Sequence, residues 1–124
     1  MILIIGGAEQ GKLQYAQLTY PDRTVYQCEL ATPAIDLDAG IINSLHLAVL
    51  AMMRADIDPL AYFTEELPRL QDKVIICDDI SSGVVPIDKE MRLWRDQLGH
   101  LLGLLSTQAE QVIRLFVGIP SRIK

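Results

Sequence analysis

The sequence has little positive charge, few cysteines and no long uninterrupted apolar run. Its 11 Lys and Arg residues are outnumbered by 16 Asp and Glu residues, which gives a formal net charge of −5. Such an acidic chain is not expected to bind nucleic acid or an anionic membrane surface, because both need a basic face. An anionic nucleotide is still compatible, since a local cradle of hydrogen-bond donors matters more for it than the total charge.

The two cysteines, Cys28 and Cys77, are far apart and each ends an apolar run. This usage predicts reduced, buried thiols in a cytoplasmic protein rather than a disulfide or a metal site. The longest hydrophobic stretch, residues 41–53, is interrupted by polar side chains and is too short to span a bilayer. No positively charged segment precedes the first apolar run, so a secretory signal is not expected.

Hydrophobic residues make up 50% of the 124 residues, and no repeat, linker or low-complexity segment divides them. We therefore expect a single nucleotide-binding domain over residues 1–124. Strands are predicted at residues 2–5, 24–28, 73–77 and 111–117, and helices at 12–18, 39–55, 59–67 and 88–106, followed by a short tail. This alternation predicts a three-layer α/β domain of the P-loop NTPase type, with a mostly parallel sheet of four to five strands.

The segment between the first strand and the first helix has the spacing of a phosphate-binding loop. Glycines let backbone N–H groups turn toward an anion, the helix start adds positive potential, and a lysine reaches the outer phosphates. The position after Lys12 normally carries a Ser or Thr that binds Mg²⁺, but it is Leu13 here. The alternative is a glycine-rich turn that has lost its ligand. The predicted nucleotide-binding residues are Gly6, Gly7, Ala8, Glu9, Gln10, Gly11, Lys12 and Leu13.

Further polar residues follow the other apolar segments. Asp78 and Asp79 end the strand near residue 77, where a carboxylate can hold Mg²⁺ directly or through water, or can simply terminate a strand. Asn43, His46 and Arg54 share one edge of the predicted helix 39–55, which either faces solvent or faces the nucleotide. In the last helix the bare positions 99 and 103, both glycine, suggest close approach by another backbone or by a ligand.

Two segments together resemble the adenosylcobinamide kinase/adenosylcobinamide-phosphate guanylyltransferase family. The first is the opening strand with its loop to Lys12. The second runs from Asp79 through Ser81-Ser82-Gly83-Val84-Val85-Pro86 to Arg92, Trp94-Arg95-Asp96 and Gly99, and is the more specific. The ending Gly118-Ile119-Pro120-Ser121-Arg122-Ile123-Lys124 is similar to the close of that family. The resemblance covers residues 1–20 and 74–124.

The resemblance implies an oligomeric enzyme of cobalamin biosynthesis. Members phosphorylate adenosylcobinamide with a nucleoside triphosphate and then transfer GMP from GTP through a guanylylated histidine, for which His46 is the candidate. Lys12, Arg92 and Arg95 would stabilise the phosphoryl charge, and Mg²⁺ would accompany GTP or ATP. Leu13, the short middle of the chain, and Leu102 and Gly103 in place of Asn-Gln depart from the family pattern.

Two other hypotheses remain. A shortened relative without the loop hydroxyl could bind a nucleotide or a corrinoid precursor as a regulator or assembly partner without catalysis. A purely structural domain could pack its apolar segment 41–53 against other copies of the chain.

Overall fold

The structure is a computed structural model that describes residues 1–80 and 88–124. The middle of the second family-like segment, from Ser81 to Pro86, therefore lies outside the described residues. No helix of the described part is both long and apolar enough to cross a membrane.

A six-stranded sheet forms the centre of the molecule, with strand order β2-β3-β4-β1-β5-β6. The first five strands in chain order pair in parallel, and β6 runs antiparallel to β5. The prediction of a mostly parallel α/β sheet is confirmed, with more strands than the four to five expected. The strands are β1 (Ile2–Gly6), β2 (Val25–Gln27), β3 (Ile41–Asn43), β4 (Val74–Asp78), β5 (Gln111–Phe116) and β6 (Ile119–Arg122).

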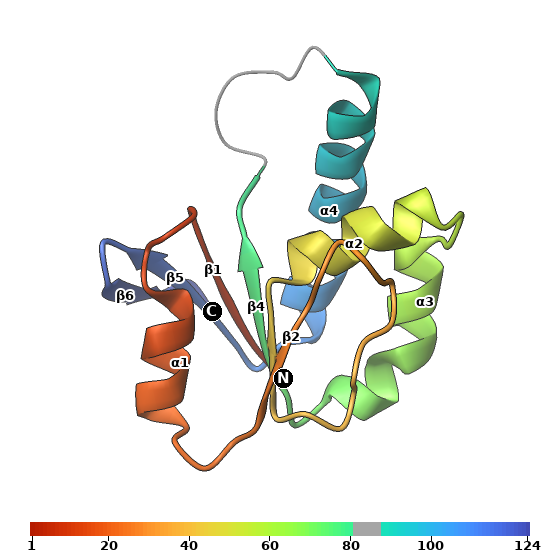
Figure 1. Ribbon diagram of the computed structural model, residues 1–124. Helices are drawn as coiled ribbons and strands as arrows, with labels where there is room; N and C mark the ends of the chain where they lie inside the picture. Colours follow the sequence, from red (N-terminus) through yellow and green to blue (C-terminus); the bar gives the residue numbers. More distant parts are fainter. Residues whose placement is uncertain (81–87) are drawn as a thin grey trace.

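Helices cover both faces of the sheet and give three layers (Figure 1). Among the described helices, α1 (Lys12–Thr19) is the one that packs on the first of these faces. The other face carries α2 (Leu45–Arg54), α3 (Pro59–Glu66), the 3₁₀ helix Leu67–Leu70 and α4 (Lys89–Gln108). Alternate strand residues feed two cores, because successive side chains of a strand point to opposite faces. Leu3 belongs to the larger core under α2–α4, whereas Ile4 belongs to the smaller core under α1.

The predicted starts of two helices are confirmed. Asp58 precedes the proline of α3 and accepts hydrogen bonds from the N–H groups of Leu60 and Ala61. Asp88 accepts from the N–H of Met91 at the start of α4. Both carboxylates satisfy donors that have no partner inside the helix and place negative charge at its positive end.

Two local expectations are wrong, and of a third, at Gly99 and Gly103, the backbone alternative is not met among the described residues. The predicted helix 39–55 is instead strand β3 followed by α2, because residues 41–43 hydrogen-bond to strands on both sides. The predicted tail contains β6, which pairs with β5 after a two-residue turn. Nothing lies within 4 Å of a Cβ built at Gly99 or Gly103, so among the described residues no backbone approaches that face of α4.

The connections create a crevice at the carboxyl ends of two neighbouring strands. The chain leaves β1 through α1 on one face of the sheet and leaves β4 through α4 on the other. Since β1 and β4 are adjacent, their following segments separate to opposite sides. In open α/β sheets ligands bind at such a point, where the strand order reverses.

Candidate phosphate-binding site

The backbone of the loop between β1 and α1 requires glycine at two places. A Cβ on Gly6 would lie 2.6 Å from the carbonyl oxygen of Leu115 on β5, closer than packing allows. Gly11 has φ +83° in the left-handed region that favours glycine, and it directly precedes α1. Glycine at position 6 is thus required by the packing of β1 against β5, whereas glycine at position 11 allows the left-handed conformation of the loop.

Lys12 lies at the centre of the site and its side chain is almost fully buried, with 6% exposed. Its Nζ donates to the carbonyl oxygen of Gly7 at 2.6 Å and lies 2.7 Å from Oδ1 of Asp78. The pairing follows from the sheet register, which places Gly6 opposite Asp78. Of the two predicted carboxylates, Asp78 is therefore the one that meets the lysine.

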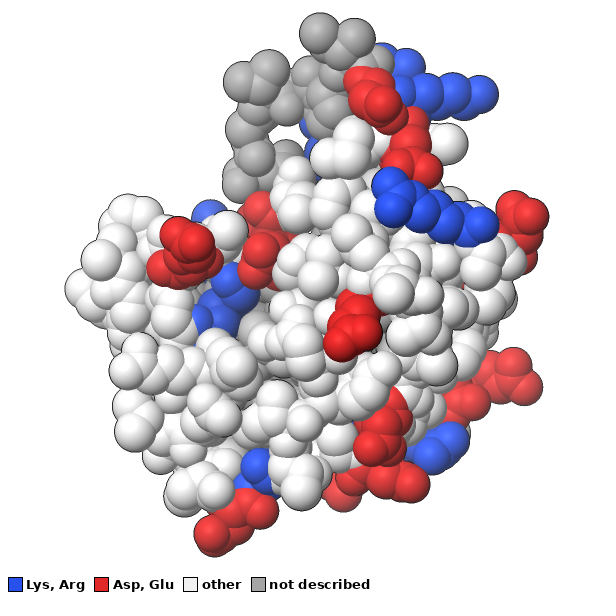
Figure 2. All heavy atoms as spheres, in the orientation of Figure 1, with Lys and Arg blue, Asp and Glu red and all other residues white. Residues whose placement is uncertain are grey.

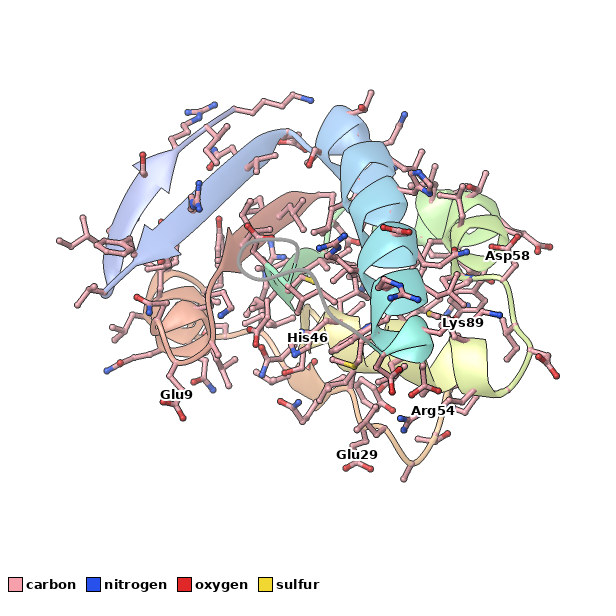
Figure 3. The ribbon with its side chains drawn as sticks, turned by 90° about the horizontal axis from the view of Figure 1, so that it is seen from above. Glu9, Glu29, His46, Arg54, Asp58 and Lys89 are labelled. Atoms are coloured by element: carbon pink, nitrogen blue, oxygen red, sulfur yellow. The ribbon has the colours of Figure 1, made fainter. Side chains whose placement is uncertain are left out.

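The backbone donors of the loop are available to a ligand. Within the described part of the chain, no acceptor takes a hydrogen bond of ordinary geometry from the N–H groups of residues 7–11. Glu9 has a backbone φ of 58°, and its exposed side chain points outward at the edge of the molecule (Figure 3). Its carboxylate therefore does not fill the cradle that its own loop forms.

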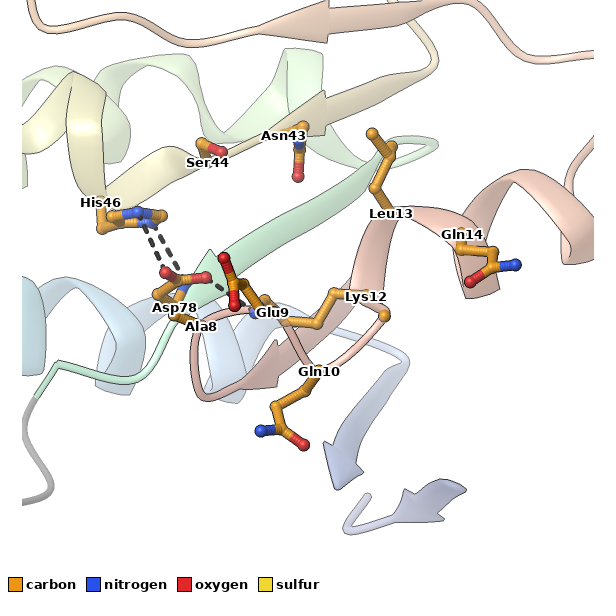
Figure 4. A pocket seen from close by; sticks show the side chains of 11 residues that line it. Ala8, Glu9, Gln10, Lys12, Leu13, Gln14, Asn43, Ser44, His46 and Asp78 are labelled. Carbon is orange, nitrogen blue, oxygen red and sulfur yellow. Dashed lines mark hydrogen bonds and ion pairs between the residues drawn. The ribbon is translucent and has the colours of Figure 1, made fainter. Parts of the chain in front are cut away.

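A pocket of about 330 Å³ opens beside the loop (Figure 4). Three elements contribute to it: the loop with the start of α1, the end of β3 with the start of α2, and the end of β4. The structure thereby brings together most of the predicted loop and three more of the residues singled out in the sequence, Asn43, His46 and Asp78. The described lining residues are Ala8, Glu9, Gln10, Gly11, Lys12, Leu13, Gln14, Asn43, Ser44, His46 and Asp78.

His46 lies behind Asp78 and contacts it twice. The Nδ1 of His46 accepts from the backbone N–H of Asp78 at 3.1 Å, and Nε2 lies 3.4 Å from the carboxylate oxygen Oδ2. The indole N–H of Trp94 donates to the carbonyl oxygen of His46 at 2.8 Å and fixes this turn of α2 against α4. Burial lowers the pKa of His46, an effect that Asp78 opposes and Lys12 reinforces.

This arrangement specifies the tautomer of the histidine. Because Nδ1 accepts a hydrogen bond, the proton of the neutral ring sits on Nε2 and faces Asp78. Both ring nitrogens of His46 are thus directed at one residue, and the Nδ1 lone pair is occupied by a main-chain donor. As a result, the ring orients Asp78 and does not aim a lone pair at the pocket.

The remaining predicted residues are dispersed. The backbone N–H of Asp79 donates to the carbonyl oxygen of Gly6 at 2.8 Å, which ties the end of β4 to the loop. Arg92 and Arg95 are on α4, outside the described lining of the pocket; Arg95 borders a second cavity of about 390 Å³. Arg54, which was predicted to share an edge with Asn43 and His46, instead pairs with Glu90 of α4 at 2.7 Å.

Sequence reasoning missed Ser44 as a site residue. Ser44 precedes α2, has φ 61° and ψ 47°, and lines the pocket. A left-handed conformation is uncommon for a residue other than glycine and is often found at functional sites. Neighbouring Asn43 also lines the pocket and donates to Oε1 of Gln27 at 2.6 Å. Both residues fall inside a helix predicted from the sequence. The sequence therefore did not predict that a strand ends here and presents them to the pocket.

The charge around the site is balanced rather than strongly positive. Figure 2 shows acidic side chains spread over the visible face with few basic ones between them, and no continuous basic surface. Attraction of an anion would therefore depend on the loop N–H groups, on Lys12 and on any metal ion that accompanies the ligand.

The fold is that of a three-layer α/β protein with a mostly parallel sheet, in which a glycine-rich loop joins the first strand to the first helix. No protein-family model matches the chain, and no curated protein matches its sequence. Among solved structures, the flagellar accessory protein FlaH from Methanocaldococcus jannaschii is similar over 99% of this chain and 77% of that one. The TM-score is 0.47 with 14% sequence identity, a similarity that carries no functional argument.

Proposed function

We propose that the chain binds a nucleoside triphosphate, GTP or ATP, with its phosphates on the loop between β1 and α1. The observation that supports this most directly is the position of Lys12 between the loop carbonyl of Gly7 and the carboxylate of Asp78. A buried ammonium group, unused main-chain donors and a helix start converge there at the carboxyl end of a parallel sheet.

Mg²⁺ fits the donor set near this loop. Asp78 lines the pocket and offers a carboxylate, the oxygen ligand that Mg²⁺ prefers; Asp79 follows it in the chain, and Mg²⁺ commonly keeps several waters. The described residues contain no group of three or more His, Cys, Asp and Glu side chains that could hold a metal alone. Bound together with the triphosphate, the ion would offset phosphate charge, while Lys12 and the loop amides orient the phosphoryl groups.

The resemblance to the adenosylcobinamide kinase/guanylyltransferase family supports a catalytic form of this proposal. In that form the chain transfers a phosphoryl group to adenosylcobinamide in cobalamin biosynthesis, as a cytoplasmic homo-oligomer, and Arg92 or Arg95 stabilises the developing charge. Guanylylation of His46 has less geometric support, because Nδ1 already accepts the N–H of Asp78. A nucleophilic nitrogen would need that lone pair to be released.

A specific observation favours the second candidate, a nucleotide-binding regulator or assembly partner without catalysis. Leu13 borders the pocket at the position where a metal-binding hydroxyl is expected, and its side chain packs against the smaller core. Without this oxygen the ion has fewer protein ligands, which weakens metal-assisted transfer more than binding of the nucleotide.

Calorimetric titration with GTP and ATP, with and without Mg²⁺, tests the binding proposal. Lys12→Ala is expected to weaken triphosphate affinity by roughly a hundredfold, because a buried charge-assisted contact is lost. The matched control is Lys89→Ala, which removes an exposed lysine at the start of α4. Equal affinity of Lys12→Ala and the unmodified protein would remove the loop from the proposal.

Incubation with adenosylcobinamide and a triphosphate separates the two candidates. Mass spectrometry should detect the phosphorylated corrinoid if the catalytic form is correct, and tight binding without product would favour the regulator. An acid-labile GMP adduct that disappears in His46→Asn would support the transferase activity. Absence of an adduct in the unmodified protein would exclude it.

A further inference from the structure

The turn between β5 and β6 sits against the outer side of the phosphate loop. Its two central residues, Val117 and Gly118, have φ 50° and φ 74°. Both donate to one loop residue: the N–H of Val117 to the side-chain Oε1 of Gln10 at 2.5 Å, and the N–H of Gly118 to the carbonyl oxygen of Gln10 at 3.0 Å. A Cβ on Gly11 would lie 3.8 Å from the Cα of Gly118, so the two segments also pack together.

These hydrogen bonds determine the direction of the peptide group between Gln10 and Gly11. In a trans peptide the C=O of one residue and the N–H of the next point in opposite directions. The carbonyl of Gln10 points toward the turn because Gly118 donates to it, so the N–H of Gly11 must point away from the turn. Gly11 lines the pocket, and its N–H has no acceptor among the described residues.

Val117 also has an unusual backbone conformation, which the two-residue hairpin turn requires. A β-branched residue at positive φ is a genuine outlier, and such a conformation persists only where the surrounding structure holds it. Here the hairpin register, with Phe116 opposite Ile119, leaves only Val117 and Gly118 to reverse the chain. The side chain of Val117 is 67% exposed, so burial of its methyl groups does not explain the conformation.

We infer that Gln10 is a positioning residue that fastens the phosphate loop to the β5–β6 turn and thereby aims the Gly11 N–H at the triphosphate. The inference rests on the proposed nucleotide binding. The side-chain amide oxygen of Gln10 accepts from the turn. The affinity of the loop for phosphate therefore depends on a hairpin formed by the last part of the described chain.

Gln10→Met tests the inference, because methionine has a similar length but offers no carbonyl acceptor. We expect triphosphate affinity to fall about fivefold to tenfold, as for loss of one hydrogen bond at a preorganised site. Hydrogen exchange of the Val117 N–H should accelerate while exchange of the β1 and β4 amides stays unchanged. Gln17→Met, an exposed position on α1, is the matched control and should alter neither measurement.

Val117→Asn provides the complementary test. Asparagine adopts positive φ more readily than valine and keeps the N–H that donates to Gln10. We expect this variant to retain triphosphate affinity within about twofold and to unfold at a higher temperature, which a disruption of the hairpin would not do.

Each result distinguishes the two proposals. If the unmodified protein binds triphosphate and Gln10→Met binds it equally well with unchanged Val117 exchange, the role of Gln10 is excluded and the proposed function stands. If the unmodified protein binds neither triphosphate nor pyrophosphate, the proposed function fails together with the assigned effect on affinity. The exchange measurement then still decides whether the Gln10 contact exists.

Discussion

The Nζ of Lys12 lies 2.7 Å from Oδ1 of Asp78, an ion pair that joins the phosphate loop to the strand beside it. The carboxylate is 24% exposed, whereas the lysine is 6% exposed, so the pair lies at the bottom of the pocket and not on the surface. Under the proposed function, phosphate oxygens that bind the loop would compete with Asp78 for the same ammonium group. Mg²⁺ would assist that exchange by giving the carboxylate a new cation to bind.

Asp78→Asn should uncouple triphosphate binding from Mg²⁺. The substitution removes the negative charge next to Lys12, so affinity measured in EDTA is expected to rise about tenfold, while the gain on adding Mg²⁺ becomes smaller. Calorimetry of GTP and ATP binding provides the measurement, and Asp72→Asn, which changes an exposed carboxylate, is the control. Weaker binding of Asp78→Asn in EDTA would contradict this competition.

Leu13→Ser should restore the hydroxyl that the loop spacing calls for. We expect Mg²⁺-dependent triphosphate affinity to increase about tenfold relative to Leu13→Ala, because serine adds an oxygen ligand at the start of α1. Leu13→Ala is the proper reference, since both variants lose the same apolar contacts with the smaller core. Equal affinities of the two variants would show that position 13 does not approach the metal.

Gly6→Ala should be strongly destabilising, whereas Gly7→Ala should not. A Cβ at residue 6 meets the Leu115 carbonyl oxygen at 2.6 Å, and a Cβ at residue 7 meets the Gln10 side chain at an ordinary 3.6 Å. Because the first clash involves backbone in a central pair of strands, we expect a loss of roughly 2–4 kcal/mol in the free energy of unfolding. Urea denaturation of both variants makes the comparison, and similar midpoints would contradict the packing between β1 and β5.

Because of His46, the free energy of unfolding should depend on pH in the mildly acidic range. Burial lowers its folded-state pKa below the ordinary 6.5, so on acidification the unfolded chain binds a proton that the folded chain does not. The contribution of His46 to the free energy of unfolding is therefore greatest above pH 6.5. It decreases as the pH drops from 6.5 toward the folded-state pKa. His46→Gln should flatten this slope.

The parts of the fold that sequence reasoning predicted are those determined by local patterns. The opening strand, the glycine loop and α1 are consecutive, and Asp58 and Asp88 cap helices through their own next residues. By contrast, Ile41–Asn43 forms a strand only because it pairs with β2 and β4, which are distant in sequence. Only Asn43 and Ser44 separate its apolar residues from those of α2, so periodicity could not separate the two elements.

The candidate site was predictable to the same extent. Lys12 and the loop could be identified from spacing, but the choice between Asp78 and Asp79 depends on the register that sets Gly6 opposite Asp78. Strand β6 was missed because Val117 is an unusual residue for a tight hairpin turn. The contact of that turn with Gln10 was missed for the same reason.

Strand β6 forms one border of the sheet and contains Pro120, opposite Leu115. Proline has no N–H, so a strand from another molecule aligned along this border would lack one main-chain partner in its middle. Growth of the sheet from molecule to molecule into fibrils is disfavoured at this border.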